Sequence, residues 1–297
     1  WQCYTPRPCS ALMEDPVRAL PPLSRAEFAR RGFVVLRAPI ISRDYCDLLN
    51  ARLEKLLRGE YDVPGGAPDK VPAFRTETRT KPGKKPPPLG GPSSRTLQVI
   101  NCWKADAAFA ALVRSPTLGR AVAEVMGWRG ARVANDQAWG KPPGAAALTF
   151  HRDSPYFDFV PAAVATVWIA LDAMTEELGP LEYVEGSHAW GDGRVGSAEQ
   201  FFDSRDPTAL LYDAARREGI AAPEASLVVE RLDVPAGGAG IHNGRLWHGS
   251  GRNRSRTQPR RGLGIHFVPA DARFRDAENG YETLAHRFRD PSGGNAL

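Results

Sequence analysis

The chain has 297 residues, 42% of them hydrophobic and 9% aromatic, which is enough to bury the core of one large domain or two small ones. No run of eighteen apolar residues occurs, and the N-terminus lacks the charged-then-apolar pattern of a secretory signal, so we expect a soluble, intracellular protein without a membrane span. The net charge of +5 is modest and locally concentrated, which favours a local anion-binding site over a nucleic-acid surface.

The first part of the sequence predicts a layer of helices. Suitable caps, such as Ser24, and apolar residues at helical spacing indicate four helices with one strand-like segment between them. The predicted helices cover 24–31, 43–58, 106–114 and 116–127, and the strand covers 33–36. We assign residues 24–130 to this helical layer and residues 1–23 to an N-terminal tail.

Residues 62–95 differ in kind from the helices around them. The segment is rich in proline and glycine and has no apolar periodicity. Its basic residues are Lys70, Arg75, Arg79, Lys81, Lys84, Lys85 and Arg95. A structureless segment of this length is usually a lid or a disordered stretch. Both a solvated basic loop and a lid that closes over an anionic substrate are compatible with it.

After residue 130 the sequence changes to short β-rich segments separated by turn residues. This spacing is typical of an antiparallel sandwich or barrel. The predicted strands cover 133–139, 147–153, 163–171, 181–184, 226–232, 238–242 and 261–268, and one helix interrupts them over 209–217. We therefore expect a β core over 131–272 within a single domain of residues 24–290, followed by a tail over 291–297.

Four cysteines are too few and too widely spaced for a disulfide scaffold or a C-x-x-C metal site. They are Cys3, Cys9, Cys46 and Cys102. A bridge between the first two remains open.

The stretch TFHRDSPYFD places His151 and Asp153 two residues apart on a predicted strand. Because successive side chains of a strand alternate between its faces, these two would point the same way and Arg152 the opposite way. This pair is half of a metal site. A third ligand would come from the later segment IHNGRLWHGSG, where His242 and His248 are the candidates. Two histidines and one carboxylate leave coordination positions open, which suits non-haem Fe(II) and dioxygen chemistry.

Alone, a His-x-Asp pattern is more often structural, but the segment RRGLGIHF supports the metal hypothesis. Alternation places Arg260, two glycines and His266 on one face of a strand, and Arg261 with the apolar residues on the other. The glycines would leave room for a small acid along the strand, and a guanidinium binds a carboxylate through two parallel hydrogen bonds.

Several motifs together resemble the phytanoyl-CoA dioxygenase family of Fe(II)/2-oxoglutarate oxygenases. They are EFARRGFVVLRAPI, FHRDSPYF, VATVWIALDAMTEELGPLEYVEGSH and GIHNGRLWHGSGRNRS with RRGLGIHF, and they occur in the order found in the family between about residues 24 and 272. The resemblance implies a double-stranded β-helix, the jelly-roll barrel of the cupins, with flanking helices.

The resemblance also implies roles for individual residues. His151, Asp153 and His248 match the iron ligands, which are also the catalytic residues. Residues matching contacts of the cosubstrate 2-oxoglutarate are Arg260, Ser250, Trp168, Gln137 and Gln98, with Arg261 as an alternative to Arg260. Asp153 argues against a halogenase, because halogenases of the family carry a small residue in place of the carboxylate.

The remaining residues near these motifs receive weaker assignments. His188 and His242 are expected to be structural or to orient the ligands. Arg152, Tyr156 and Phe157 follow the first ligand closely and are candidates for the substrate pocket, although packing at its rim would explain them equally well.

The resemblance implies an Fe(II)- and 2-oxoglutarate-dependent dioxygenase that uses O2, releases succinate and CO2, and hydroxylates an unactivated C–H bond. Its substrate would be a small molecule or an acyl thioester, and desaturation or cyclisation is an alternative outcome. Two other classes stay open: a non-catalytic binding protein of the same fold, and a cupin-type metal hydrolase or isomerase.

Overall fold

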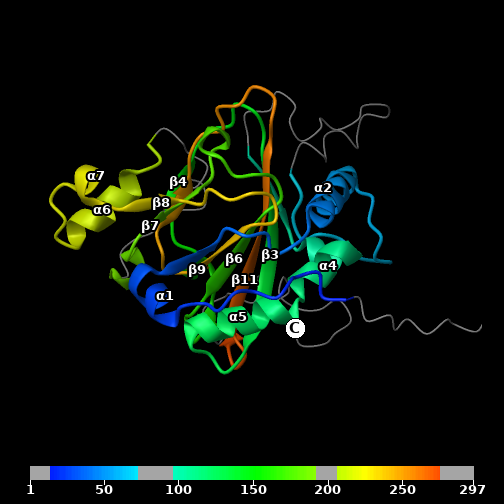
Figure 1. Cartoon of the computed structure of the whole chain (residues 1–297), viewed down its shortest axis with the longest axis horizontal. Helices are drawn as coiled ribbons and strands as arrows, with labels where there is room; N and C mark the ends of the chain where they lie inside the picture. The colour runs from blue at the N-terminus through cyan, green and yellow to red at the C-terminus, as the bar shows by residue number, and fades with distance from the viewer. Residues whose placement is uncertain (1–13, 73–95, 192–205, 275–297) are drawn as a thin grey trace, which may run out of the picture.

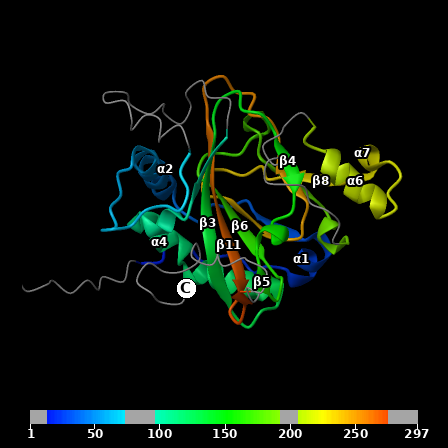
Figure 2. The same ribbon diagram turned by 180° about the vertical axis from the view of Figure 1, so that it is seen from behind.

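The structure, a computed structural model, describes residues 14–72, 96–191 and 206–274. Two antiparallel sheets form its centre, with helices on the outer side of each (Figure 1). Helices α2 (Arg43–Arg58), α4 (Ala107–Val113) and α5 (Pro116–Met126) lie beside the larger sheet. Helices α6 (Ala209–Arg217) and α7 (Pro223–Ser226) lie beyond the smaller one. The view from behind shows the same arrangement (Figure 2).

The larger sheet has six strands in the order β1-β9-β6-β11-β3-β2, and every neighbouring pair is antiparallel. Its strands are β1 (Phe33–Leu36), β2 (Leu97–Ile100), β3 (Ala131–Lys141), β6 (Ala165–Ala170), β9 (Ala239–Asn243) and β11 (Arg260–Pro269). The two strands from the N-terminal part, β1 and β2, form its edges. The layer predicted as helical therefore also completes the sheet.

The smaller sheet has the order β4-β10-β7-β8 and is also antiparallel. Its strands are β4 (Leu148–His151), β7 (Leu181–Val184), β8 (Val229–Arg231) and β10 (His248–Ser250). A separate pair joins β5 (Phe159–Val160) to β12 (Arg273–Phe274). Within the described residues the strands form these sheets and no closed barrel.

The helices begin and end where their caps predict. Ser24 accepts a hydrogen bond from the Glu27 backbone at the start of α1 (Arg25–Arg31), and Asp106 accepts two at the start of α4. Gly32 ends α1 with a φ of 83°, a left-handed conformation that favours glycine. The five helices predicted from the sequence are all present within one residue of their expected ends.

The largest core cluster lies between the larger sheet and the N-terminal helices. Leu263, Ile265 and Phe267 of β11 face it, which is the apolar face that strand alternation predicts. A second cluster with Trp168 and Tyr183 lies between the two sheets. These two layers give β11 one face in the core and the other toward the interior of the sandwich.

The predicted fold class is confirmed as mainly antiparallel β with flanking helices, but several boundaries differ. Strands β2 and β10 were not predicted as strands, and the strand predicted over 226–232 is shorter in the structure, because α7 ends at Ser226 and β8 covers only Val229–Arg231. Within the predicted N-terminal tail, Val17 is buried in the main core and Arg18 donates to Ile40.

Some predictions fall outside the described residues. These are most of the basic segment, residues 73–95, as well as Cys3, Cys9 and the tail over 291–297. Cys46 and Cys102 are buried free thiols. None of the helices in the described ranges combines the length and apolar character that a membrane span requires.

Candidate active site

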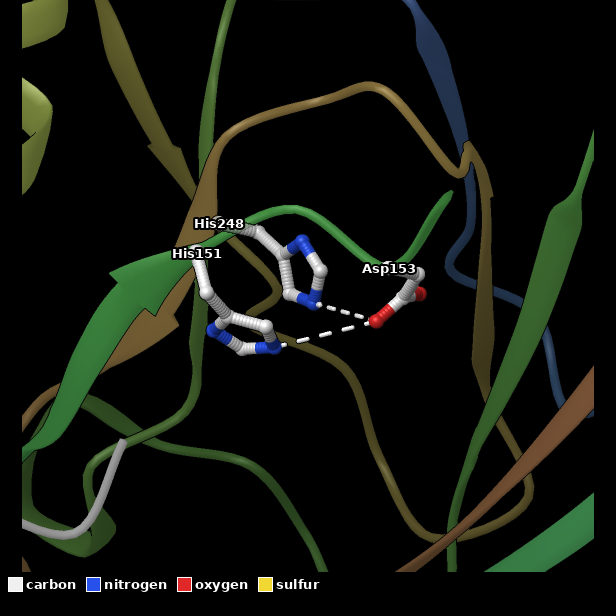
Figure 3. A group of neighbouring side chains, drawn as sticks. All are labelled: His151, Asp153 and His248. Atoms are coloured by element: carbon white, nitrogen blue, oxygen red, sulfur yellow. Dashed lines mark ion pairs between the residues drawn. The ribbon is translucent and has the colours of Figure 1, made fainter. Parts of the chain in front are cut away.

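His151, Asp153 and His248 meet in the space between the two sheets (Figure 3). His151 is the last residue of β4 and His248 is the first residue of β10. The two residues are direct partners across the β4–β10 ladder. Asp153 Oδ1 lies 3.7 Å from His151 Nε2 and 3.6 Å from His248 Nε2. All three side chains are buried, and their ligand atoms lie within 4.8 Å of one another. Together they could hold one metal ion.

The backbone brings Asp153 to this point in a way that the sequence did not predict. The strand ends at His151, and Asp153 has helical dihedral angles, φ −78° and ψ −41°, before the short 3-10 helix Ser154–Tyr156. The expectation that both ligands lie on one strand is therefore wrong. A turn, and not strand alternation, directs the carboxylate toward the histidines.

Backbone carbonyls fix the orientation of both imidazoles. His151 Nδ1 lies 2.9 Å from the carbonyl oxygen of Thr149, and His248 Nδ1 lies 3.0 Å from that of Leu246. A carbonyl only accepts, so each Nδ1 carries a proton, and Nε2 is the ring nitrogen that remains available to bind a metal. Both Nε2 atoms face Asp153 (Figure 3). This tautomer is the one that histidine ligands of metals adopt.

Asp153 is held at its second oxygen. Thr166 Oγ1 donates to Oδ2 at 2.6 Å, and His242 Nε2 lies 3.0 Å from the same atom. His266 Nε2 lies 3.7 Å from it. Oδ1 thus faces the two histidine ligands, and it is the carboxylate oxygen that is oriented to bind a metal.

Burial and charge keep the ligands in the states that bind a metal. Burial lowers the pKa of His151 to about 3, so its imidazole is neutral at neutral pH. Burial alone would raise the pKa of Asp153, but His248 and the hydrogen bond from His242 outweigh it and bring the pKa well below its usual range. Two imidazoles and one carboxylate are a donor set that fits Fe(II).

Arg260 lies in the same cavity and is 1% exposed. Its Nε and Nη2 donate to the carbonyl oxygen of Gly179 at 3.2 and 3.0 Å, and its Nη1 has no partner among the described residues. Burial lowers its pKa to about 10, which leaves the guanidinium charged at neutral pH. The adjacent Arg261 instead forms two hydrogen bonds of 2.8 Å with the carboxylate of Asp172. Of the two arginines, Arg260 is thus the one placed to receive an anion in the cavity.

The two glycines beside Arg260 do not leave open space, as the sequence had suggested. A Cβ on Gly262 would come within 2.8 Å of the Trp168 indole, and one on Gly264 within 3.2 Å. The glycines therefore make room for Trp168, which lines the cavity and whose buried Nε1 has no partner. The indole ring centre is 5.7 Å from the Arg260 guanidinium carbon.

Ser250 and the two predicted glutamines also line the cavity. Gln98 Nε2 donates to Gln137 Oε1 at 2.9 Å, and Lys70 Nζ donates to Gln98 Oε1 at 3.2 Å. Because a lysine ammonium only donates, this chain fixes both amides and leaves the Gln137 amino group as a donor. The Ser250 hydroxyl is contacted by Lys141, a residue to which the sequence analysis gave no role.

The three residues expected at the substrate pocket separate in the structure. Tyr156 and Phe157 line the cavity. Arg152 does not: its Nη1 donates to the carbonyl oxygen of Gly191, and its guanidinium carbon lies 5.5 Å from the Trp247 ring centre. His242 supports Asp153, as expected of a histidine that orients a ligand.

His188 lies away from the site and contacts the carbonyl oxygen of Ala29 in α1. Thr166 and His266 were missed as site residues, because their closeness to Asp153 depends on pairing between distant strands.

The cavity joins the metal-binding group and the cation in one space of about 430 Å³. This volume lies within the range of small-molecule sites. Along the β3–β11 ladder, Arg260 pairs with Lys141 at one end, and His266 pairs with Asn135 six residues farther along β11. A small acid that reached from the metal ligands to the guanidinium would lie over Trp168.

Comparison with known proteins agrees with this geometry. The family model of phytanoyl-CoA dioxygenase (PhyH) matches residues 28–262. A "Probable alpha-ketoglutarate-dependent hypophosphite dioxygenase" from Stutzerimonas stutzeri is 31% identical over 142 residues, 48% of this chain and 46% of that protein. "Dioxygenase aneA" from Aspergillus aculeatus is 27% identical over 149 residues, 48% of this chain and 41% of that protein. The chain thus matches less than half the length of either relative.

Solved structures share the fold at low sequence identity. The epimerase SnoN from nogalamycin biosynthesis, crystallised with Fe3+ and alpha ketoglutarate, is 17% identical with a TM-score of 0.62, over 91% of this chain and 90% of that one. The carbocyclase SnoK is 18% identical with a TM-score of 0.61, over 93% and 94%. HygX from Streptomyces hygroscopicus, with nickel and 2-oxoglutarate bound, is 16% identical with a TM-score of 0.55, over 84% and 89%. On the family match, the chain belongs to the phytanoyl-CoA dioxygenase (PhyH) family.

Proposed function

We propose that the protein is an Fe(II)- and 2-oxoglutarate-dependent dioxygenase that hydroxylates a C–H bond of a small molecule. The observation that carries this proposal is the presence, in one cavity, of a His-Asp-His group and a buried arginine with an unpartnered Nη1. A metal hydrolase or isomerase would need only the His-Asp-His group. A 2-oxo acid with a second carboxylate needs both: a metal that it can chelate and a cation for its other end.

His151, Asp153 and His248 would hold the iron through Nε2, Oδ1 and Nε2. Three protein ligands leave coordination positions for a bidentate 2-oxo acid and for O2. Iron, 2-oxoglutarate and O2 together supply the oxidant, and succinate and CO2 are the co-products. The hydrogen bonds to Asp153 Oδ2 keep its other oxygen directed at the ion.

Arg260 and Ser250 would bind the distal carboxylate of 2-oxoglutarate. The unpartnered Nη1 of Arg260 offers a charge-assisted hydrogen bond, which is about twice as strong as a neutral one. Trp168 would cover the chain of the cosubstrate and offer its indole N–H. Gln137 and Gln98 lie farther along the wall, and the free amino group of Gln137 suits an oxygen of the cosubstrate or of the substrate.

Tyr156 and Phe157 would form the substrate side of the pocket. Phe157 is buried with its ring centre 5.1 Å from that of His266, while Tyr156 is 41% exposed. Aromatic side chains at this place exclude water and orient one C–H bond of the substrate toward the metal. A small molecule fits the cavity volume, and an acyl thioester is a second form of substrate that the basic segment over 62–95 would suit.

The test is the O2-dependent conversion of 2-oxoglutarate to succinate by the Fe(II)-loaded protein. We expect slow succinate formation without substrate and faster formation when an accepted small molecule or thioester is added. Incorporation of oxygen from O2 into the product identifies hydroxylation, and its absence with continued succinate formation indicates desaturation or cyclisation. A metal-loaded protein that forms no succinate under O2 contradicts the proposal and favours a binding protein or a hydrolase.

A further inference from the structure

Two buried basic side chains lie side by side: Arg260, which lines the cavity, and Lys141, which lies next to it. Lys141 ends β3 and is the direct partner of Arg260 across the β3–β11 ladder. Lys141 is 0% exposed and Arg260 is 1% exposed. A lysine is rarely buried without a partner of opposite charge. The burial of Lys141 next to a second basic residue therefore needs a physical reason.

The side-chain nitrogen of Lys141 contacts a short segment of chain that follows the metal ligand His248. Its Nζ lies 2.7 Å from Ser250 Oγ and 3.5 Å from the Ser250 carbonyl oxygen, and it also contacts the carbonyl oxygen of Gly251. An ammonium has three N–H donors and no acceptor, and carbonyl oxygens only accept. As an ammonium, Lys141 donates to all three atoms, and the Ser250 oxygen receives a hydrogen bond.

This arrangement determines where the Ser250 hydroxyl hydrogen points. Since its oxygen already accepts from Lys141, the O–H is free to donate elsewhere. No second partner of Ser250 Oγ is found in the described part of the chain, and Ser250 lines the cavity. The hydroxyl is therefore available as a donor to a ligand in the cavity, which Arg260 also lines.

The charges at this end are not balanced by the described residues. Glu182 and Asp172 act on Lys141 and Arg260 only through space. Each is hydrogen-bonded to a different arginine, Glu182 to Arg231 and Asp172 to Arg261. Burial, and next the charge of Arg260, hold the pKa of Lys141 well below its usual range. An anion bound at Arg260 in the cavity would supply the missing counter-charge and would favour the ammonium form of Lys141.

We propose that Lys141 is a positioning residue for the distal carboxylate of 2-oxoglutarate: it orients the Ser250 hydroxyl as a donor into the cavity and adds a second positive charge beside Arg260. This inference rests on the function proposed above. Its consequence is selectivity for 2-oxo acids that carry a second carboxylate over those of equal length without one.

The experiment compares two ligands on the Fe(II)-loaded protein without O2. One ligand is 2-oxoglutarate and the other is 2-oxovalerate, which has a methyl group in place of the distal carboxylate. Binding of either is followed by the visible charge-transfer absorbance of the chelated complex. In Lys141→Met we expect the affinity for 2-oxoglutarate to fall about ten- to a hundredfold, the size associated with losing a hydrogen bond to a charged group. The affinity for 2-oxovalerate should stay unchanged.

Three further variants separate positioning from a structural role. Lys55→Met makes the same substitution at an exposed lysine of α2 and should leave both affinities unchanged. Lys141→Gln keeps a donor but removes the charge, and it serves if Lys141→Met does not fold; it should also lose affinity for 2-oxoglutarate alone. In a Ser250→Ala background, Lys141→Met should have a smaller further effect, because part of its action passes through the hydroxyl.

Each outcome distinguishes the inference from the proposed function. Unchanged binding of 2-oxoglutarate by a folded Lys141 variant overturns the inference, and so does an equal loss for both ligands, which indicates a structural role. A protein of unchanged sequence that gives no charge-transfer band with 2-oxoglutarate contradicts the proposed function and the inference together. Thermal unfolding of every variant shows whether the fold is intact.

Discussion

The metal-binding residues and the buried basic pair Lys141 and Arg260 differ in how their charges are balanced by neighbouring groups. At the metal end, the atoms that orient the three candidate ligands have partners: the imidazole Nδ1 atoms of His151 and His248 bind backbone carbonyls, and the carboxylate of Asp153 binds Thr166. At the other end, Lys141 and Arg260 lie buried without a carboxylate at hydrogen-bonding distance among the described residues.

The difference shows which part of each end depends on a ligand. At the metal end, the protein itself orients the three candidate ligands toward one point. At the cationic end, burial and the charge of Arg260 hold the pKa of Lys141 well below its usual range, and a bound anion would stabilise the charged form. Substitutions at the metal end should therefore affect metal affinity, and substitutions at the cationic end should affect cosubstrate affinity.

Replacing the metal-binding carboxylate should have the largest effect. Asp153→Ala removes the only carboxylate that the structure places against the two histidine ligands within the described residues. We expect no detectable succinate formation and a collapse of Mn(II) affinity measured by calorimetry. Asp213→Asn, on the exposed face of α6, is the control and should change neither. Retained turnover in Asp153→Ala would show that the metal is held elsewhere.

The two adjacent arginines should differ by a wide margin. Arg260→Ala removes the guanidinium in the cavity and should weaken 2-oxoglutarate binding about a hundredfold, with metal affinity intact. Arg261→Ala breaks the ion pair with Asp172 and should cost about 1 kcal/mol of stability or less. Cosubstrate titrations and thermal unfolding measure the two effects. The reverse result would mean that the register of β11 assigned here is wrong.

The hydrogen bond to the far oxygen of Asp153 should have a smaller effect. Thr166→Val keeps the shape of the side chain but removes the 2.6 Å bond to Oδ2. Groups that orient metal ligands typically change metal affinity about ten- to a hundredfold, and we expect the lower value because His242 still binds the same oxygen. The preference for 2-oxoglutarate over 2-oxovalerate should not change. A variant that changes this preference instead would contradict the separation of the two ends.

The last prediction concerns how the free energy of unfolding of the metal-free protein changes with acid. Burial lowers the pKa of His151 to about 3 and that of His242 to about 4, from 6.5. Below about pH 6.5 the unfolded chain binds protons that the folded state does not, so the free energy of unfolding falls as the pH decreases toward about 4. Its slope should approach about 1.4 kcal/mol per pH unit for each histidine.

Urea unfolding across this pH window measures the slope. His242→Gln removes one of the histidines whose pKa burial lowers, a set that also includes His266, and should reduce the slope by up to about 1.4 kcal/mol per pH unit. A free energy of unfolding that does not change between about pH 5 and about pH 6.5 would show that these histidines are not buried in neutral form.

Local signals made much of the fold and site predictable. Caps such as Ser24 and Asp106 act within one turn, so the helix starts follow from neighbouring residues. The position of Arg260 on the interior face of β11 follows from strand alternation alone. The structure brings His151 and His248 together, as the motif resemblance had implied.

The features that escaped prediction depend on contacts between distant segments. Lys141 reads as an ordinary lysine before two prolines, and only its pairing with Arg260 and its contact with Ser250 give it a role. Thr166 gains its role through the packing of β6 against the turn that carries Asp153. The space over the β11 glycines was misjudged because Trp168 approaches from the neighbouring strand.

The most direct test of the central claim is made without O2. Fe(II) is added to the metal-free protein, then 2-oxoglutarate, and the visible spectrum is recorded. The account predicts a metal-to-ligand charge-transfer band that needs both additions and that disappears in Asp153→Ala. If the folded protein of unchanged sequence binds Fe(II) but gives no such band with 2-oxoglutarate, the cavity does not hold the chelate and the oxygenase assignment is contradicted.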